Sequence, residues 1–141
     1  ISIADFSQSS KTKRLFIIDL TERKLLFQTW VAHGKNSGGE FAKYFSNTPQ
    51  SYKSSFGFFV TGETYNGDHG LSLRLYGMEK GINDNAEARR IVIHAASYVS
   101  QKFINQNGFL GRSEGCPALS EELSNDIINT IKDGSCFYIY H

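Results

Sequence analysis

Residues 111–119 read GRSEGCPAL, a short stretch with two glycines, one proline and one of the chain's two cysteines. It places Cys116 between Gly115 and Pro117, where neither neighbour buries much surface. Proline biases the residue before it toward extended geometry, and glycine lets the backbone approach a substrate without a Cβ in the way. Pro117 also lacks an N–H, so an oxyanion hole here has to use backbone donors at Glu114, Gly115 or Cys116. The stretch therefore predicts a loop that presents a thiol for chemistry.

The imidazole of His94 is the candidate partner for this thiol. The next helix is predicted to begin only at about Ser120, so no helix N-terminus lowers the pKa of Cys116. A free thiol has a pKa roughly two units above that of free imidazole, and a nearby cationic imidazole favours the thiolate. His94 ends the apolar run IVIH at residues 91–94, which predicts a strand that presents the ring at a sheet edge. Either residue alone is more often structural, but the two in this order favour a catalytic pair.

Strands dominate the predicted secondary structure. Alternating or continuous apolar runs predict strands at residues 14–19, 24–32, 56–61, 71–76, 91–94 and 136–140. The first two are expected to form a hairpin across residues 21–23, and residues 62–70 are expected to form a turn-rich loop. Helices are predicted at residues 98–105 and 120–132, the second capped by Ser120 and stopped by Gly134. The pattern indicates a mainly β fold with one or two helices.

The composition fits one domain over residues 1–141. Lys and Arg number 15 and Asp and Glu 14, so the net charge of +1 argues against a partner such as nucleic acid or anionic lipid. No apolar run approaches the roughly 20 residues of a transmembrane segment. The opening sequence ISIADFSQSSKTKR lacks a signal peptide, so we expect either a cytosolic protein or one whose leader has been removed. The two cysteines set no disulfide framework, and Cys136 is expected to be a buried hydrophobe.

The pattern of His94 followed by Ser113-x-Gly115-Cys116 resembles the L,D-transpeptidase catalytic domain, the YkuD-type fold. It is most similar to the murein L,D-transpeptidase subgroup with a GRSxGCPA-type signature. Further segments support the resemblance along nearly the whole chain: VAHGKNSGG, FVTGETYNG, GINDNA and IVIHAA. The resemblance implies a β-sandwich or barrel-like catalytic domain that acts outside the cytoplasm on peptidoglycan stem peptides, without a cofactor.

The resemblance also implies roles for individual residues. Cys116 matches the family nucleophile and His94 its base, and the backbone carbonyl of Ala95 matches the third member of the site. Arg112, Ser113 and Gly115 fall in the active-site motif, with the N–H groups of Gly115 and Cys116 as oxyanion donors. Carbapenems are the inhibitors that the family implies. Many members carry glycine where this chain has Ala95, and histidine or a bulky residue where it has Glu114.

Three residues of the 62–70 loop, Tyr65, Asn66 and His69, are predicted to bind substrate as a lid, with a plain surface loop as the alternative. His33, which follows a strand, is predicted to line the pocket, with a backbone-bonded turn histidine as the alternative. Arg74 is interpreted either as a partner for a substrate carboxylate or as a solvent-facing side chain. The run NDN at residues 83–85 is interpreted as peptide-binding or, more ordinarily, as a turn.

Other functions remain open at this stage. On the same site, water in place of an amine would give an L,D-carboxypeptidase, and a degenerate site would leave a non-catalytic wall-binding domain. A sortase-like transpeptidase requires an arginine soon after the cysteine, and no arginine follows Cys116. A zinc site would draw on His33, His69, His94, Cys116 and His141. Their spacing matches no standard zinc pattern.

Overall fold

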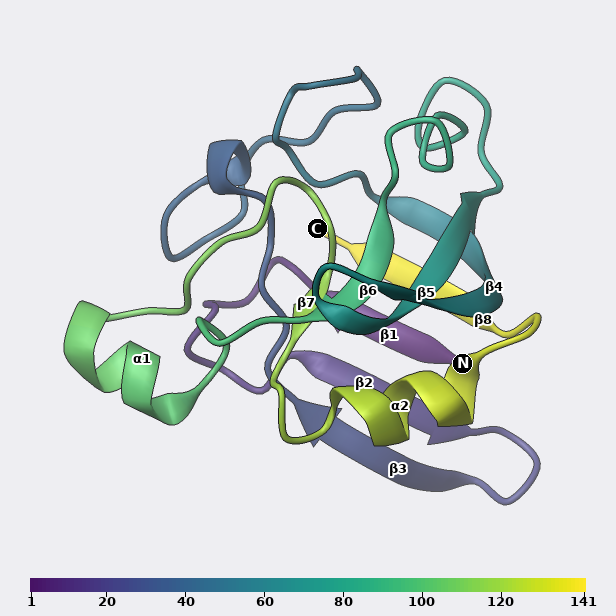
Figure 1. Ribbon diagram of the computed structural model, residues 1–141, viewed down its shortest axis with the longest axis horizontal. Helices are drawn as coiled ribbons and strands as arrows, with labels where there is room; N and C mark the ends of the chain where they lie inside the picture. The colour runs from purple at the N-terminus through teal and green to yellow at the C-terminus, as the bar shows by residue number, and fades with distance from the viewer.

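A computed structural model describes residues 1–141, and its centre is one curled sheet of eight strands (Figure 1). The order across the sheet is β3-β2-β1-β8-β4-β5-β6-β7. The strands are β1 (Ser2–Asp5), β2 (Leu15–Asp19), β3 (Lys24–Thr29), β4 (Gly57–Gly67), β5 (Gly70–Gly77), β6 (Val92–Ala95), β7 (Ala118–Leu119) and β8 (Cys136–Tyr140). The expectation of a mainly β fold with one or two helices is confirmed, since the structure has two α-helices.

The two ends of the chain meet at the centre of this sheet. Strand β1 pairs in parallel with β8, so Ser2 lies opposite Phe137 and Ala4 opposite Ile139. The buried face of β1 consists of Ser2 and Ala4, both fully buried. Because these side chains are small, no apolar alternation marks the strand in the sequence, and β1 was not predicted.

The prediction of a turn-rich loop at residues 62–70 was wrong. Strands β4 and β5 continue through this region as one long antiparallel hairpin, and only Asp68 and His69 remain outside them. The register shifts between Thr61 and Thr64, which marks a bulge at Gly62. A Cβ at Gly62 would lie 2.4 Å from a ring carbon of Tyr76, so this glycine serves close packing within a strand.

The first helix, α1 (Gln101–Asn107), begins three residues later than predicted. Its N-cap is Ser100, whose Oγ accepts the N–H of Phe103 at 3.0 Å. Its C-cap, Gly108, has φ = 92°, a left-handed conformation that glycine adopts without strain.

The second helix, α2 (Ser124–Ile131), begins four residues later than predicted and ends before Gly134. Ser120 does not cap it through its side chain; instead its carbonyl accepts the N–H groups of Leu123 and Ser124, which forms a separate turn. The predicted apolar stripe is correct for Ile127, Ile128 and Ile131, all of which are buried. This stripe covers β5 and β6, so α2 supports the strand that carries His94 from behind.

The parallel pair β6 and β7 positions the predicted catalytic residues. His94 lies opposite Ala118 and Ala95 opposite Leu119, so Cys116 comes two residues before the point where the strands pair. The loop that carries Cys116 and precedes β7 is called the cysteine loop. Isolated β-bridges from Gly34 to Ser113 and from Ala32 to Ala118 hold this loop against the segment that follows β3. A short 3₁₀ helix, η1 (Lys35–Ser37), follows Gly34. None of the helices has the length and apolar character needed to cross a membrane.

Candidate active site

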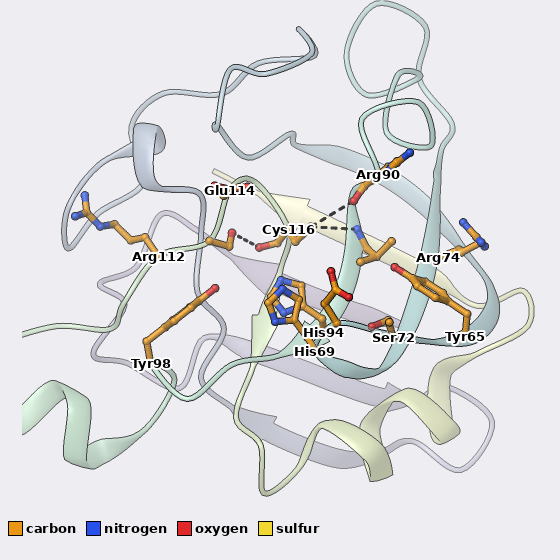
Figure 2. Close-up of a pocket in the computed structure, with 14 residues that line it drawn as sticks. Tyr65, His69, Ser72, Arg74, Arg90, His94, Tyr98, Arg112, Glu114 and Cys116 are labelled. Carbon is orange, nitrogen blue, oxygen red and sulfur yellow. Dashed lines mark hydrogen bonds between the residues drawn. The ribbon is translucent and has the colours of Figure 1, made fainter.

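A cavity of about 910 Å³ lies between the β4–β5 hairpin, the end of β6 and the loop before β7 (Figure 2). Six of the residues predicted from the sequence line it: Tyr65, His69, His94, Arg112, Ser113 and Cys116. The cavity therefore brings together the cysteine loop, the strand-end histidine and the hairpin, which lie far apart in the sequence.

Cys116 is a free thiol at the wall of this cavity. Its sulfur accepts the N–H of Val92 at 3.4 Å and lies 3.5 Å from the carbonyl oxygen of Arg90, to which the S–H donates. Both contacts are drawn in Figure 2. No hydrogen bond joins the sulfur to His94, although both side chains line the same cavity on neighbouring segments.

His94 is 5% exposed and its orientation is fixed from two sides. Its Nδ1–H donates to the carbonyl of Ala95 at 2.8 Å, which leaves Nε2 as the nitrogen able to accept a proton. The ring of His69 stacks on it at 4.3 Å between centroids, with 19° between the planes. The carbonyl of Ala95 and the ring of His69 therefore orient the imidazole at the cavity with Nε2 unbonded.

The environment opposes a resting thiolate–imidazolium pair. Burial raises the pKa of the Cys116 thiol, and the Val92 N–H and the charge of Arg89 only partly offset this. Burial also lowers the pKa of His94, with an opposing contribution from its hydrogen bond to Ala95 and a further lowering by His69. Both shifts favour the neutral thiol and the neutral imidazole, contrary to the ion pair expected from the sequence.

Arg89 is a positive charge behind the thiol that the sequence analysis did not identify. Its guanidinium donates only to neutral oxygens, on Ser46, Ser51, Lys53 and Ser55. It forms no ion pair with a carboxylate, and with Cys116 it lines a smaller cavity of about 260 Å³. Because the guanidinium has no carboxylate partner, its charge is available to stabilise a thiolate at Cys116.

Replacing Arg89 with glutamine is expected to slow the alkylation of Cys116 at pH 7 by roughly tenfold, because losing the adjacent positive charge raises the thiol pKa further and lowers the fraction of thiolate. Arg90→Gln is the matched control, since its side chain is exposed and screened by water. Iodoacetamide labelling followed across pH, with Cys116 and Cys136 separated by peptide mass, measures the pKa. Arg89→Lys should recover most of the rate if charge is responsible; a rate as low as that of the glutamine variant would contradict this explanation.

A local network holds the cysteine loop in shape. Ser113 is buried, and its Oγ accepts the Gly115 N–H at 3.1 Å and donates to the carbonyl of Cys116. Gly115 has φ = 128°, and a Cβ there would lie 2.9 Å from the carbonyl oxygen of Lys53, so only glycine fits. Glu114 points to solvent with 73% of its side chain exposed, and its carboxylate pairs with Lys35 at 3.3 Å. Its effect on Cys116 is the smallest of the contributions to that thiol pKa.

The hairpin contributes two of its three predicted residues. Tyr65 and His69 line the cavity, but Asn66 does not. Side chains alternate along a strand, so Asn66 points to the face opposite Tyr65 and is exposed. The prediction that Asn66 binds substrate has no support from this arrangement.

His33 does not line the cavity, which contradicts its interpretation as a wall residue and fits the alternative of a backbone-bonded histidine. It is 1% exposed, and its Nδ1 lies 2.8 Å from Nη2 of Arg14, which donates to it. Its Nε2 lies 3.2 Å from the carbonyl of Gly38. Burial and the charge of Arg14 lower the pKa of His33 to about 4. The residue is a neutral part of the core rather than of the site.

This burial makes the protein sensitive to acid. Because the folded pKa of His33, about 4, lies below the ordinary 6.5, the unfolded state binds more protons between these values. Stability is therefore full above pH 6.5 and falls as the pH drops toward 4, by roughly 3 kcal/mol. Urea unfolding at pH 7 and pH 4.5 should show a smaller loss in His33→Gln than in the wild type. Equal losses in the two proteins would contradict this role.

Two other sequence interpretations are decided by contacts. Arg74 lines the cavity but is engaged with the hairpin, because its Nε pairs with Glu63 at 2.8 Å and its guanidinium lies over Tyr65. Asn83 is fully buried and donates to the carbonyls of Phe56 and Phe58, so it is structural. The lining residues that the sequence analysis missed include Ser72, Arg90 and Tyr98. No short-range pattern marks them, because the sheet brings them together.

No three or more His, Cys, Asp or Glu side chains are grouped so that they could hold a metal ion. His69 and His94 stack face to face, and His33 is buried against Arg14. His141 packs against Phe45 and Phe56 instead. His33 and His141 thus lie apart from the stacked pair of His69 and His94.

Several solved structures have a similar fold. An L,D-transpeptidase from Mycobacterium smegmatis aligns at TM-score 0.57 and 12% identity over 99% of this chain. The L,D-transpeptidase LdtMt1 in complex with imipenem aligns at 0.57 and 14% over 98%, and the helical cell shape determining protein Pgp2 from Campylobacter jejuni at 0.58 and 14% over 99%. This chain spans 58%, 57% and 46% of those three structures.

The sequence itself identifies the family. Residues 1–140 match the family model described as L,D-transpeptidase catalytic domain. Among curated proteins, none matches the chain. The chain belongs to the L,D-transpeptidase catalytic domain family, which confirms the resemblance seen in the motif around Cys116.

Proposed function

We propose that the protein is a cysteine acyltransferase that carries out L,D-transpeptidation on peptidoglycan stem peptides outside the cytoplasm. The observation that carries this proposal is the shared cavity of Cys116 and His94, in which the Ala95 carbonyl leaves Nε2 of the imidazole free to accept a proton. Membership of the family supplies the substrate class.

In the first step, Cys116 passes its proton to Nε2 of His94 and its sulfur attacks the carbonyl carbon of an L,D-peptide bond in the donor stem. The C–N bond breaks, and the imidazolium returns the proton to the departing amine. A rotation of the Cys116 side chain away from the Arg90 carbonyl precedes this step, since the S–H points to that oxygen before substrate binds. The charge of Arg89 and the N–H of Val92 stabilise the transient thiolate.

In the second step, an amine of a neighbouring stem attacks the thioester and gives its proton to His94. The C–S bond breaks and the sulfur regains a proton, which leaves a crosslinked product. Water as the attacking group would give an L,D-carboxypeptidase by the same steps. The donors proposed for the oxyanion are the N–H groups of Cys116 and Gly115. The Gly115 N–H already donates to Ser113 Oγ, so it has to be shared with the substrate oxygen.

Imipenem tests the proposal directly, because attack on its β-lactam carbonyl opens the ring and expels no fragment. Intact mass spectrometry should show one adduct of the full inhibitor mass on the wild type and on Cys136→Ala, and none on Cys116→Ala. No adduct on the wild type, or an equal adduct on Cys116→Ala, would overturn the assignment. Incubation with purified disaccharide-peptides then separates crosslinked from trimmed products.

A further inference from the structure

A second cavity, of about 490 Å³, adjoins the one that contains Cys116. It lies between α1, the loop after α1 and η1, and it shares Tyr98 and Arg112 with the catalytic cavity. The two cavities are therefore neighbours that meet at these two side chains. A substrate held at the thiol therefore extends into the second cavity if its chain continues past Tyr98.

One wall of this cavity is aromatic. Phe103 and Phe109 are half-buried and line it together with Leu110. Burial is the main reason that the pKa of Tyr98 is raised to about 12, so its hydroxyl stays protonated and can donate a hydrogen bond. In Figure 2 this hydroxyl points toward the catalytic cavity, and Tyr98 lines both cavities. Such a wall suits the aliphatic part of a peptide.

The opposite rim is cationic. Its two charged residues are Lys35 and Arg112, and none of the residues lining the cavity is acidic. Lys35 already pairs with Glu114. Arg112 has no carboxylate partner: its Nη1 donates to the carbonyls of Lys35 and Gly38, at 3.3 and 3.2 Å. These two bonds hold one nitrogen of the exposed guanidinium, and Nε and Nη2 make no hydrogen bond within the protein.

We infer that this second cavity binds a carboxylate-bearing segment of the peptide substrate, with the carboxylate on Arg112 and the adjoining aliphatic chain against Phe103 and Phe109. An oriented guanidinium with free donors matches a carboxylate in two-point geometry. The inference rests on the proposed function and adds the chemical feature by which the protein selects its substrate away from the bond that reacts.

The experiment uses Cys116→Ala, which binds without turnover, and a synthetic tetrapeptide stem that contains a γ-linked glutamate. The same peptide with the free glutamate carboxylate converted to a carboxamide is the matched ligand. Calorimetry should give about tenfold tighter binding for the carboxylate form, the usual range for charge-assisted hydrogen bonds. Adding Arg112→Gln should abolish the preference, and Arg112→Lys should reduce it, because lysine lacks the planar fork.

Lys102→Gln is the control, since it removes one positive charge from α1 but Lys102 does not line the cavity. It should keep the preference, and unfolding midpoints verify that each variant is folded. Equal affinity for the two peptides, or a preference that survives Arg112→Gln, would overturn the inference. An imipenem adduct on Cys116 together with equal peptide affinities would remove the subsite and leave the proposed function. A carboxylate preference without an imipenem adduct would support the subsite and contradict the proposed function.

Discussion

Replacing His94 with alanine is expected to lower the rate of acyl transfer by about 10²–10⁴-fold, the usual contribution of a positioned acid–base group. The structure makes the loss large, because Cys116 rests as a neutral thiol whose pKa is raised by burial. Without Nε2 of His94 to accept the proton, only the small thiolate fraction reacts. Product formation by liquid chromatography, or the rate of imipenem acylation, measures the loss.

The pH profile separates a catalytic from a merely structural role for His94. Burial lowers the pKa of His94 below its ordinary value of 6.5, so the base is neutral and available throughout the neutral range. The acid limb of the wild-type profile should therefore fall below pH 6.5, and activity should be lost as the pH drops through that pKa. In His94→Ala this limb should disappear, and the residual rate should rise with hydroxide as the thiol ionises directly.

His69→Ala is the matched control for the same position. It removes the stacked ring and its effect on the pKa of His94, but it leaves the hydrogen bond to Ala95 intact. We expect the acid limb to move to higher pH with a much smaller loss of rate than in His94→Ala. A His94→Ala enzyme that keeps a tenth or more of the wild-type rate would remove His94 from the mechanism.

Local chemistry explains why the sequence predicted the centre of the site. The turn around Cys116 and the strand that ends at His94 are each short, and their residue types are unusual enough to be specific together. The strands with a continuous apolar run, such as β2 and β8, were also found within a residue or two. Where the buried face is made of small side chains, as in β1, the alternation vanishes and the prediction fails.

Long-range burial explains what the sequence could not predict. Gly62 indicated a turn, yet it lies within β4. A glycine is required there because the Tyr76 ring occupies the space into which a Cβ would project. Arg89 donates to the loop between η1 and β4, which lies about 40 positions earlier in the chain. His33 was interpreted as a pocket residue because nothing near it in sequence shows that Arg14 donates to its ring. Periodicity describes neighbours along one element, whereas such contacts depend on how the whole sheet curls.

Arg14 shows the largest expected effect on stability. The residue is fully buried, and Nε and Nη2 donate to the carbonyl of Val31 at 3.1 and 2.8 Å. Nη1 donates to the carbonyl of Gln8 at 2.8 Å, and the guanidinium lies over the ring of Phe6. Burial lowers its pKa to about 9, which still leaves it charged at neutral pH. The side chain thus ties the loop after β1 to the end of β3 and to His33.

Arg14→Ala is expected to lower the free energy of unfolding by about 3–5 kcal/mol, because it opens a cavity and leaves buried acceptors without donors. Urea unfolding measures the loss, and an unchanged slope against urea indicates that the transition stays two-state. Arg14→Met separates the two causes, since it refills much of the volume without restoring a donor. If the methionine variant is as stable as the wild type, filling this space matters and the hydrogen bonds do not. If Arg14→Ala lowers the free energy of unfolding by less than about 1 kcal/mol, neither the cavity nor the unpaired acceptors destabilise the fold as expected.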